Sequence, residues 1–178
     1  MEDFINETIN TKDLPRFEEV EFSKLEDAYW KVILIKILIY FVIISIGFGL
    51  LVYFDAVHNN MELGIADFML AKIIGILLFF LLILGLSRIS FKKKGYAFRT
   101  YDVLYKSGII ATNTIIIPYN RVQNVALHEG LVSRFFGLSE IQIFTAGASS
   151  SDIEIPGINK DEAENIKQLL MGKIQKEL

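Results

Sequence analysis

Two long apolar runs occupy the first half of the chain, and each contains a single charged residue. The first extends from Val32 to Phe54 and includes Lys36, and the second extends from Phe68 to Leu86 and includes Lys72. Neither run repeats polar residues at helical spacing, so neither is typical of an amphipathic surface helix. About 20 apolar residues in a helix cross the hydrocarbon layer of a bilayer. We therefore predict transmembrane helices over residues 32–54 and 68–86, within a hairpin spanning residues 24–90.

The pattern changes after Gly95 to short apolar stretches separated by Gly, Asn, Pro and Ser. This alternation is typical of short strands and turns, so residues 91–178 are predicted to form a mainly-β domain. The segment Leu131–Phe136 is expected to form a single helical turn. The predicted strands are Tyr96–Thr100, Val103–Lys106, Ile109–Ala111, Ile115–Pro118, Val122–His128, Glu140–Thr145 and Ile153–Pro156.

An amphipathic helix is predicted at the end of the chain. Asn159 is suited to cap its start, with Glu162 at the capping-box position. One apolar face is expected to comprise Ala163, Ile166, Leu169, Leu170 and Ile174. Seven strands followed by one such helix predict a strongly curved antiparallel sheet whose open end is closed by the helix. The predicted fold class is thus a membrane α-helical hairpin joined to an α+β, mainly-β domain.

The start of the chain is acidic. Residues 1–31 carry nine acids and four bases, and residues 1–23 are predicted to form a poorly ordered tail. Ser23 and Glu26 have capping-box spacing, which predicts a helix start near Lys24. The first apolar run is too long for a cleaved signal peptide and follows acidic residues, so we interpret it as a retained helix.

Lysine and arginine positions predict the orientation. The segment Asp55–Asp67 has neither residue, whereas the basic run from Arg88 to Lys94 follows the second helix. The positive-inside rule then places both termini in the cytoplasm of a multi-pass protein. Lys36 and Lys72 each lie about one turn inside an apolar run, from where their side chains are expected to snorkel to the interface.

Composition excludes several function classes. Cysteine is absent and only two histidines occur, which argues against metal centres, disulfides and cysteine catalysis. His128 adjoins Glu129, but no nucleophile accompanies the pair, so we expect no enzyme, cofactor or small-molecule substrate. The pI of about 5.5 argues against nucleic-acid binding.

Three sets of residues are candidates for binding. Anionic headgroups are expected to attract the cations Lys92, Lys93, Lys94 and Arg99. A partner protein is expected to contact Arg121, Gln123, Arg134, Phe135 and Phe136. Close helix packing, within the chain or against a second protein, is expected at Ser45, Gly49, Ala71 and Gly75, although chance placement is an alternative. Arg121 and Arg134 have a structural alternative as well: both would fix turns, with the phenylalanines in the core.

The second half resembles the bacterial PH-like domain of YdbS-type membrane proteins. The resemblance covers about Gly95 to Leu170 and depends on four motifs in order, at Ile117–Val125, Glu129–Leu138, Thr145–Gly147 and Ile155–Ile158. It implies a PH-like sandwich or barrel on the cytoplasmic side of two helices in the bacterial inner membrane. It also implies oligomers or a sister PH-domain membrane protein as partner, with links to envelope stress and bacteriocin defence.

Two functions therefore follow as hypotheses. The first is a membrane-anchored interaction or assembly module at the cytoplasmic face. The second is a sensor of anionic lipid that uses the basic cluster beside the membrane. Residues 90–178 carry 11 bases and nine acids, a net charge of only +2. The electrostatic attraction of this segment to anionic lipid is therefore weak, which argues against the second hypothesis.

Overall fold

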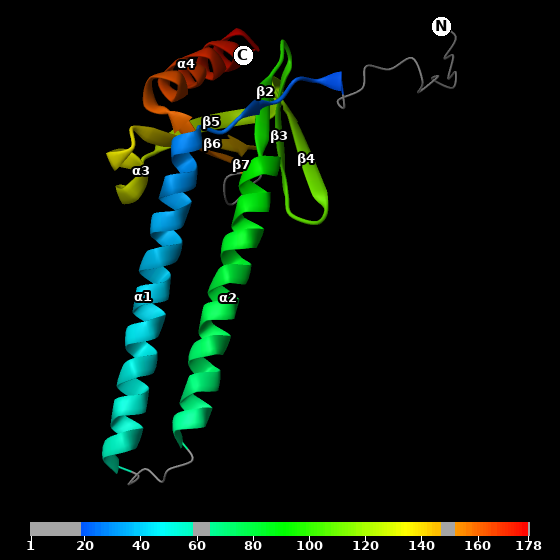
Figure 1. Ribbon diagram of the computed structural model, residues 1–178. Helices are drawn as coiled ribbons and strands as arrows, with labels where there is room; N and C mark the ends of the chain where they lie inside the picture. Colours follow the sequence, from blue (N-terminus) through cyan, green and yellow to red (C-terminus); the bar gives the residue numbers. More distant parts are fainter. Residues whose placement is uncertain (1–18, 59–64, 147–151, 178) are drawn as a thin grey trace, which may run out of the picture.

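Figure 1 shows the computed structural model, in which two long helices extend side by side from a β domain. The structure describes residues 19–58, 65–146 and 152–177, without the side chains of 55–58, 65–69, 71 and 175–177. The long helices are α1 (Asp27–His58) and α2 (Ile65–Lys93). Residues 1–18 of the expected acidic tail and residues 59–64 of the expected outer loop lie outside the described residues.

The β domain consists of two antiparallel sheets. In the first sheet the strand order is β1 (Ser23–Lys24), β2 (Gly95–Phe98), β3 (Asp102–Gly108) and β4 (Thr112–Pro118). A 3-10 turn, η3 (Tyr119–Arg121), leads to the second sheet. This sheet comprises β5 (Val122–His128), β6 (Leu138–Thr145) and β7 (Ile153–Asn159), with the short helix α3 (Leu131–Phe135) between β5 and β6. The predicted mainly-β domain is confirmed.

Six of the seven predicted strands are present, but the prediction for Ile109–Ala111 is wrong. These residues form the turn between β3 and β4. Gly108 adopts a φ of 139°, and a Cβ atom at this position would lie 1.9 Å from the carbonyl oxygen of Ala111. Only glycine allows the chain to reverse so tightly. The residues Ile109–Ala111 therefore lie at the tip of the β3–β4 hairpin.

The capping box predicted at Ser23 and Glu26 is also wrong. Ser23 pairs with Tyr96 and Lys24 pairs with Gly95, which makes this segment the edge strand β1. The helix begins three residues after Lys24, at Asp27. The pairing of Ser23 with a strand more than 70 residues away leaves no signal in the local sequence. The capping-box spacing therefore predicted a helix start where the structure has a strand.

The core of the β domain includes both ends of the hairpin. Leu25 and Val32 from the start of the chain are buried, as is Phe91 near the end of α2. The ring of Trp30 lies 5.9 Å from that of Phe91, centroid to centroid, and the Arg88 guanidinium lies 4.7 Å from the Trp30 centroid. The helices are therefore packed into the domain and are not joined to it by free linkers.

Helix α4 (Lys160–Glu177) packs against β5, β6 and β7, as predicted for the closing helix. Asn159 Oδ1 accepts a hydrogen bond from the Asp161 N–H at 3.0 Å, which confirms the cap. Glu162 instead accepts a hydrogen bond from the Tyr96 hydroxyl at 3.1 Å and ties α4 to β2. Ala163 and Leu170 are buried, but Leu169, predicted for the same face, is half exposed.

The apolar surfaces of α1 and α2 are largely exposed. Their segments Asp27–Phe54 and Lys72–Lys93 are long and apolar enough to cross a membrane, and neither is buried by the rest of the chain. The helices meet at Phe41 and Phe80, whose ring centroids are 4.4 Å apart. Exposed apolar helices of this length are not the core helices of a soluble domain.

The two glycines of the small-residue pairs, Gly49 and Gly75, are open in the structure. A Cβ atom at Gly49 or at Gly75 would meet nothing within 4 Å. Ser45 is half-buried, and the side chain of Ala71 lies outside the described part of the chain. The two glycines therefore do not form the contact between α1 and α2 within the chain.

Candidate interaction sites

A broad groove lies between the free edge of β5 and the end of α4. Its cavity volume is about 720 Å³, and its lining includes Arg121, Gln123 and Asn124 on one side and Ile174 on the other. Strand β5 pairs only with β6 among the described strands, so its other edge carries backbone groups without a ladder partner. Unpaired strand edges are the usual template for adding another strand. The groove thus combines an open edge with polar side chains.

Arg121 lies where this groove meets a second hollow. That hollow has a volume of about 490 Å³ and is lined by Ile115–Pro118 of β4 together with Thr145 and Asp152. The Arg121 side chain is exposed, and no hydrogen bond or ion pair to it is present among the described residues. Its carbonyl oxygen accepts a hydrogen bond from the Ala146 N–H at 3.3 Å. The main chain of Arg121 closes the turn, and the guanidinium remains available to a carboxylate.

Several side-chain contacts fix the floor of the groove, which is formed by Tyr119. The Tyr119 ring is buried, and its hydroxyl donates to the Arg99 carbonyl oxygen at 2.7 Å. Burial, with the Asp102 carboxylate nearby, raises the pKa of Tyr119 to about 12. Lys173 of α4 lies 6.0 Å from the centroid of the same ring and donates to the Thr100 carbonyl oxygen at 3.2 Å. These contacts hold the end of α4 in place beside β5.

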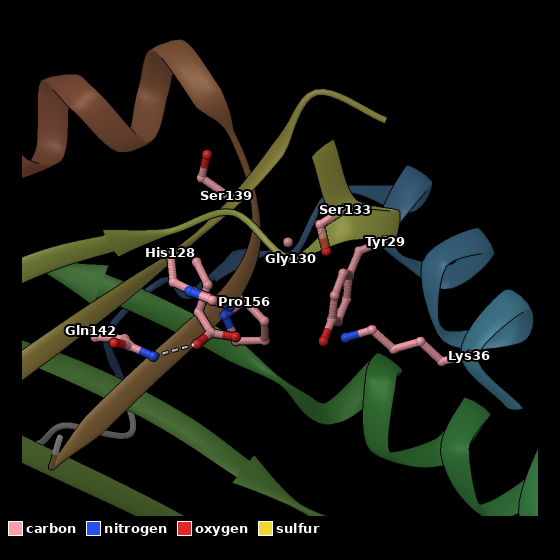
Figure 2. A pocket seen from close by; sticks show the side chains of 10 residues that line it. Tyr29, Lys36, His128, Gly130, Ser133, Ser139, Gln142 and Pro156 are labelled. Atoms are coloured by element: carbon pink, nitrogen blue, oxygen red, sulfur yellow. Dashed lines mark hydrogen bonds between the residues drawn. The ribbon is translucent and has the colours of Figure 1, made fainter. Parts of the chain in front are cut away.

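A second, polar pocket lies where α1 enters the β domain (Figure 2). Its volume is about 190 Å³. Tyr29 and Lys36 reach into it from α1, and their polar ends point toward each other. The other polar side chains of its lining are Ser133, which belongs to α3, and four residues of the second sheet: His128, Ser139, Glu140 and Gln142. The pocket therefore brings a lysine of the apolar run together with polar groups of the β domain.

Glu140 is the acidic group at this junction. Its carboxylate accepts a hydrogen bond from Gln142 Nε2 at 2.9 Å (Figure 2). Burial lowers the pKa of Lys94, and the negative charge of Glu140 opposes this shift. Burial also raises the pKa of Tyr105, with the same carboxylate contributing. The half-buried carboxylate of Glu140 is therefore a counter-charge for the junction.

The four proposed headgroup cations do not form one cluster. Lys92 and Lys93 are exposed at the end of α2, and Lys94 is half-buried beside them. Arg99 lies beyond the far end of β2, where its guanidinium holds Asp102 through two hydrogen bonds of 2.5 and 2.6 Å. The structure thus brings three of the four cations together and places Arg99 in a loop at the opposite end of the strand.

Helix α3 presents its apolar residues to the surface. Phe135 is 90% exposed, whereas Phe136 is half-buried. Arg134 is exposed and lies near an ion pair, 2.9 Å long, between Lys160 and Glu129. The hydrogen bond from Lys160 lowers the pKa of Glu129. The structural alternative for this turn, with both phenylalanines in the core, is wrong for Phe135.

Sequence reasoning missed the residues of the junction pocket. The snorkelling of Lys36 stays a prediction, and its neighbours Ser133 and Glu140 in the pocket come from distant segments. One signal was available: Tyr29 and Lys36 are seven residues apart, which places them on one face of a helix. No group of three or more acidic or histidine side chains that would hold a metal ion occurs in the described ranges.

The described architecture is that of a PH-like domain preceded by two helices able to span a membrane. A family model described as the bacterial PH domain matches residues 31–174. The chain belongs to this family, in agreement with the resemblance carried by its motifs. No curated protein and no solved structure matches the chain. PH domains are in general non-catalytic interaction modules.

Proposed function

We propose that this protein is a membrane-anchored interaction module whose groove between β5 and α4 binds an extended segment of a partner protein. The observation that carries the proposal is the open edge of β5 beside the exposed Arg121 and Gln123. A strand added to a sheet edge gains affinity from main-chain hydrogen bonds and specificity from side-chain pockets. The Arg121 guanidinium would select a carboxylate on the incoming segment.

The proposed location is the bacterial inner membrane, with both termini and the PH-like domain in the cytoplasm. Exposed apolar surface along α1 and α2 supports the membrane anchor. Lys92 and Lys93 at the domain end of α2 support the orientation, because basic residues favour the cytoplasmic side. Trp30 and Tyr29 lie at the same end, where interfacial aromatic residues are common.

The proposed partner is a second copy of this chain or a sister PH-domain membrane protein. Gly49 and Gly75 are open to approach by another helix, which supports assembly within the membrane. A role in envelope stress or bacteriocin defence is proposed from the resemblance to YdbS-type proteins. Assembly in the bilayer and strand addition at β5 are separate contacts, and each can be tested alone.

The test is photo-cross-linking in intact cells with the full chain carrying a photoreactive residue at Gln123. We expect one discrete cross-linked product, which mass analysis after purification in mild detergent identifies. Arg121→Glu should reduce this product by roughly tenfold, as expected for loss of about 1.4 kcal/mol from a charge-assisted contact. The matched control is Lys24→Glu, a charge reversal on exposed β1. A monomer that cross-links to nothing would overturn the proposal.

A second candidate function is recognition of an anionic lipid headgroup, favoured by the cations at the junction. Lys36 lines the polar pocket on one side of Tyr29, and Lys94 lines a hollow on its other side. The full chain in bilayer discs should then be stabilised by anionic lipid over neutral lipid, and Lys94→Gln should remove the difference. Equal thermal stability in the two lipids would exclude this candidate.

A further inference from the structure

We propose that the β3–β4 turn and helix α3 insert apolar side chains into the cytoplasmic leaflet, one on each side of the helix pair. The inserting side chains are Ile110 of the turn and Leu131 and Phe135 of α3. This inference rests on the membrane placement of α1 and α2 proposed above. It concerns a different surface from the groove between β5 and α4.

These three side chains are the most exposed large apolar groups of the β domain. Ile110 is 95% exposed, Phe135 90% and Leu131 83%. Each sits on a short projecting element, so no neighbouring side chain covers it. Single exposed apolar residues are common on protein surfaces and by themselves have no meaning. Their position relative to the membrane helices is what distinguishes them.

The register of the first sheet fixes the level of the β3–β4 turn. Strand β2 starts at Gly95, two residues after α2 ends, and Gly95 pairs with Lys106 of β3. Residues that follow Lys106 therefore extend past the start of β2 and back along α2. Lys93 Nζ donates to the Ile109 carbonyl oxygen at 2.5 Å, which ties the turn to the last turn of α2.

Ile109 shows how far the turn reaches. It lines a hollow together with Ile83 and Leu86, which belong to the second apolar run. The neighbouring Ile110 thus lies at the level where α2 leaves the hydrocarbon layer. Figure 1 shows the β3–β4 turn beside the upper part of α2, on the side away from α1.

Helix α3 reaches the same level on the other side. Gly130 and Ser133 line the junction pocket with Lys36, which lies four residues inside the apolar run that begins at Val32. Leu131 and Phe135 flank Ser133 on this short helix. Figure 1 shows α3 next to the upper part of α1, so the helix pair stands between the two apolar elements.

The surroundings favour lipid as the occupant. Between the two elements lie Trp30 and Arg88, stacked at 4.7 Å, and the exposed cations Lys92 and Lys93. Aromatic rings and snorkelling cations next to apolar tips are typical of groups at the boundary between headgroups and acyl chains. Three attachment points, the helix pair and two tips, would hold the PH-like domain at a fixed tilt on the membrane.

Tyr101 provides an internal comparison. It is 77% exposed, but it lies in the loop between β2 and β3, at the opposite end of β3 from Ile110. Tyr101 is therefore expected to remain in water. Ile110 and Tyr101 are both highly exposed but lie at opposite ends of β3. Comparing them therefore separates the effect of depth in the membrane from the effect of solvent exposure alone.

The absence of cysteine from the chain makes the test direct. Single-cysteine variants Ile110→Cys, Phe135→Cys, Tyr101→Cys and Leu81→Cys of the full chain are labelled with an environment-sensitive fluorophore. Each is placed in phosphatidylcholine vesicles with and without lipids that carry a spin-label quencher. We expect the labels at 110 and 135 to be quenched several-fold more than the label at 101. The label at 81, in the middle of α2, should be quenched most.

Each contrary outcome has a distinct meaning. Labels at 110 and 135 that behave like the label at 101, while the label at 81 is quenched, would overturn this inference and leave the anchor intact. A label at 81 that is not quenched would overturn the membrane placement and this inference together. Labels at 110 and 135 that are shielded from a water-soluble quencher but not reached by lipid quenchers would show a protein interface, which also overturns the inference.

Discussion

Gly157 of β7 leaves the space that the ring of Tyr29 occupies: a Cβ atom at position 157 would lie 2.4 Å from Tyr29 Cγ. The same glycine accepts a hydrogen bond from the Glu26 N–H through its carbonyl oxygen, at 2.9 Å. Its φ of 68° is in the left-handed region. The start of α1 is thus locked against the second sheet, and the PH-like domain cannot rotate freely about the helix pair.

Gly157→Ala should destabilise the protein through both the clash with Tyr29 and the left-handed backbone. Gly137 is a matched control, because its φ is 65° but a Cβ atom there would meet nothing within 4 Å. We expect Gly137→Ala to lower the free energy of unfolding by about 1 kcal/mol. Gly157→Ala should lower it by a further ~1–3 kcal/mol from overpacking. Denaturation of the full chain in detergent measures both, and equal losses would contradict the close contact.

Tyr119→Phe should alter how stability depends on alkaline pH. The pKa of Tyr119 is raised to about 12 in the folded protein, so its contribution is fully present below the unfolded value near 10. That contribution is lost as the pH rises through the folded pKa. The wild-type protein should therefore melt at a higher temperature than the variant at pH 8, and the gap should narrow above pH 10. The control is Tyr101→Phe, because the ring of Tyr101 is exposed. A difference in melting temperature between wild type and Tyr119→Phe that stays the same at all pH values would refute the expectation.

Asn159→Ala should weaken the start of α4. The side chain caps the helix through the Asp161 N–H, and loss of such a cap costs about 1 kcal/mol. The same substitution at Asn165, exposed inside α4, should be neutral or slightly stabilising because alanine is the better helix former. Thermal melting of the two variants compares them directly. A loss at Asn165 as large as that at Asn159 would show that the cap contributes nothing.

Gly49→Leu and Gly75→Leu should leave the stability of the single chain unchanged, because each position is open in the structure. If these glycines face a second helix, as proposed, both variants should reduce a cross-linked dimer in the membrane several-fold. Gly47→Leu is the control, since Gly47 is equally open but outside the small-residue pair. A dimer yield that is the same in all variants would exclude the glycine face as a contact.

The sequence by itself determined the features that depend on local pattern. The apolar runs around Lys36 and Lys72 identify two helices able to cross a membrane, because length and composition suffice for this. Strand β5 was predicted with its exact limits, Val122–His128, since alternation is local and turn residues bound the segment. Asn159 marked the start of α4 for the same reason.

Only the tertiary structure decided which segments meet. Strand β1 exists because Ser23 pairs with Tyr96, and the same segment alone has the pattern of a helix cap. The groove at Arg121 depends on α4 lying beside the free edge of β5, and the junction pocket depends on Lys36 of α1 meeting Ser133 of α3. The exposure of Phe135 and Ile110 could not be predicted from the sequence either, because the burial of a side chain depends on which other segments pack against it. Periodicity records the face that a residue takes within its own element, whereas contacts between distant elements arise from packing of the whole chain.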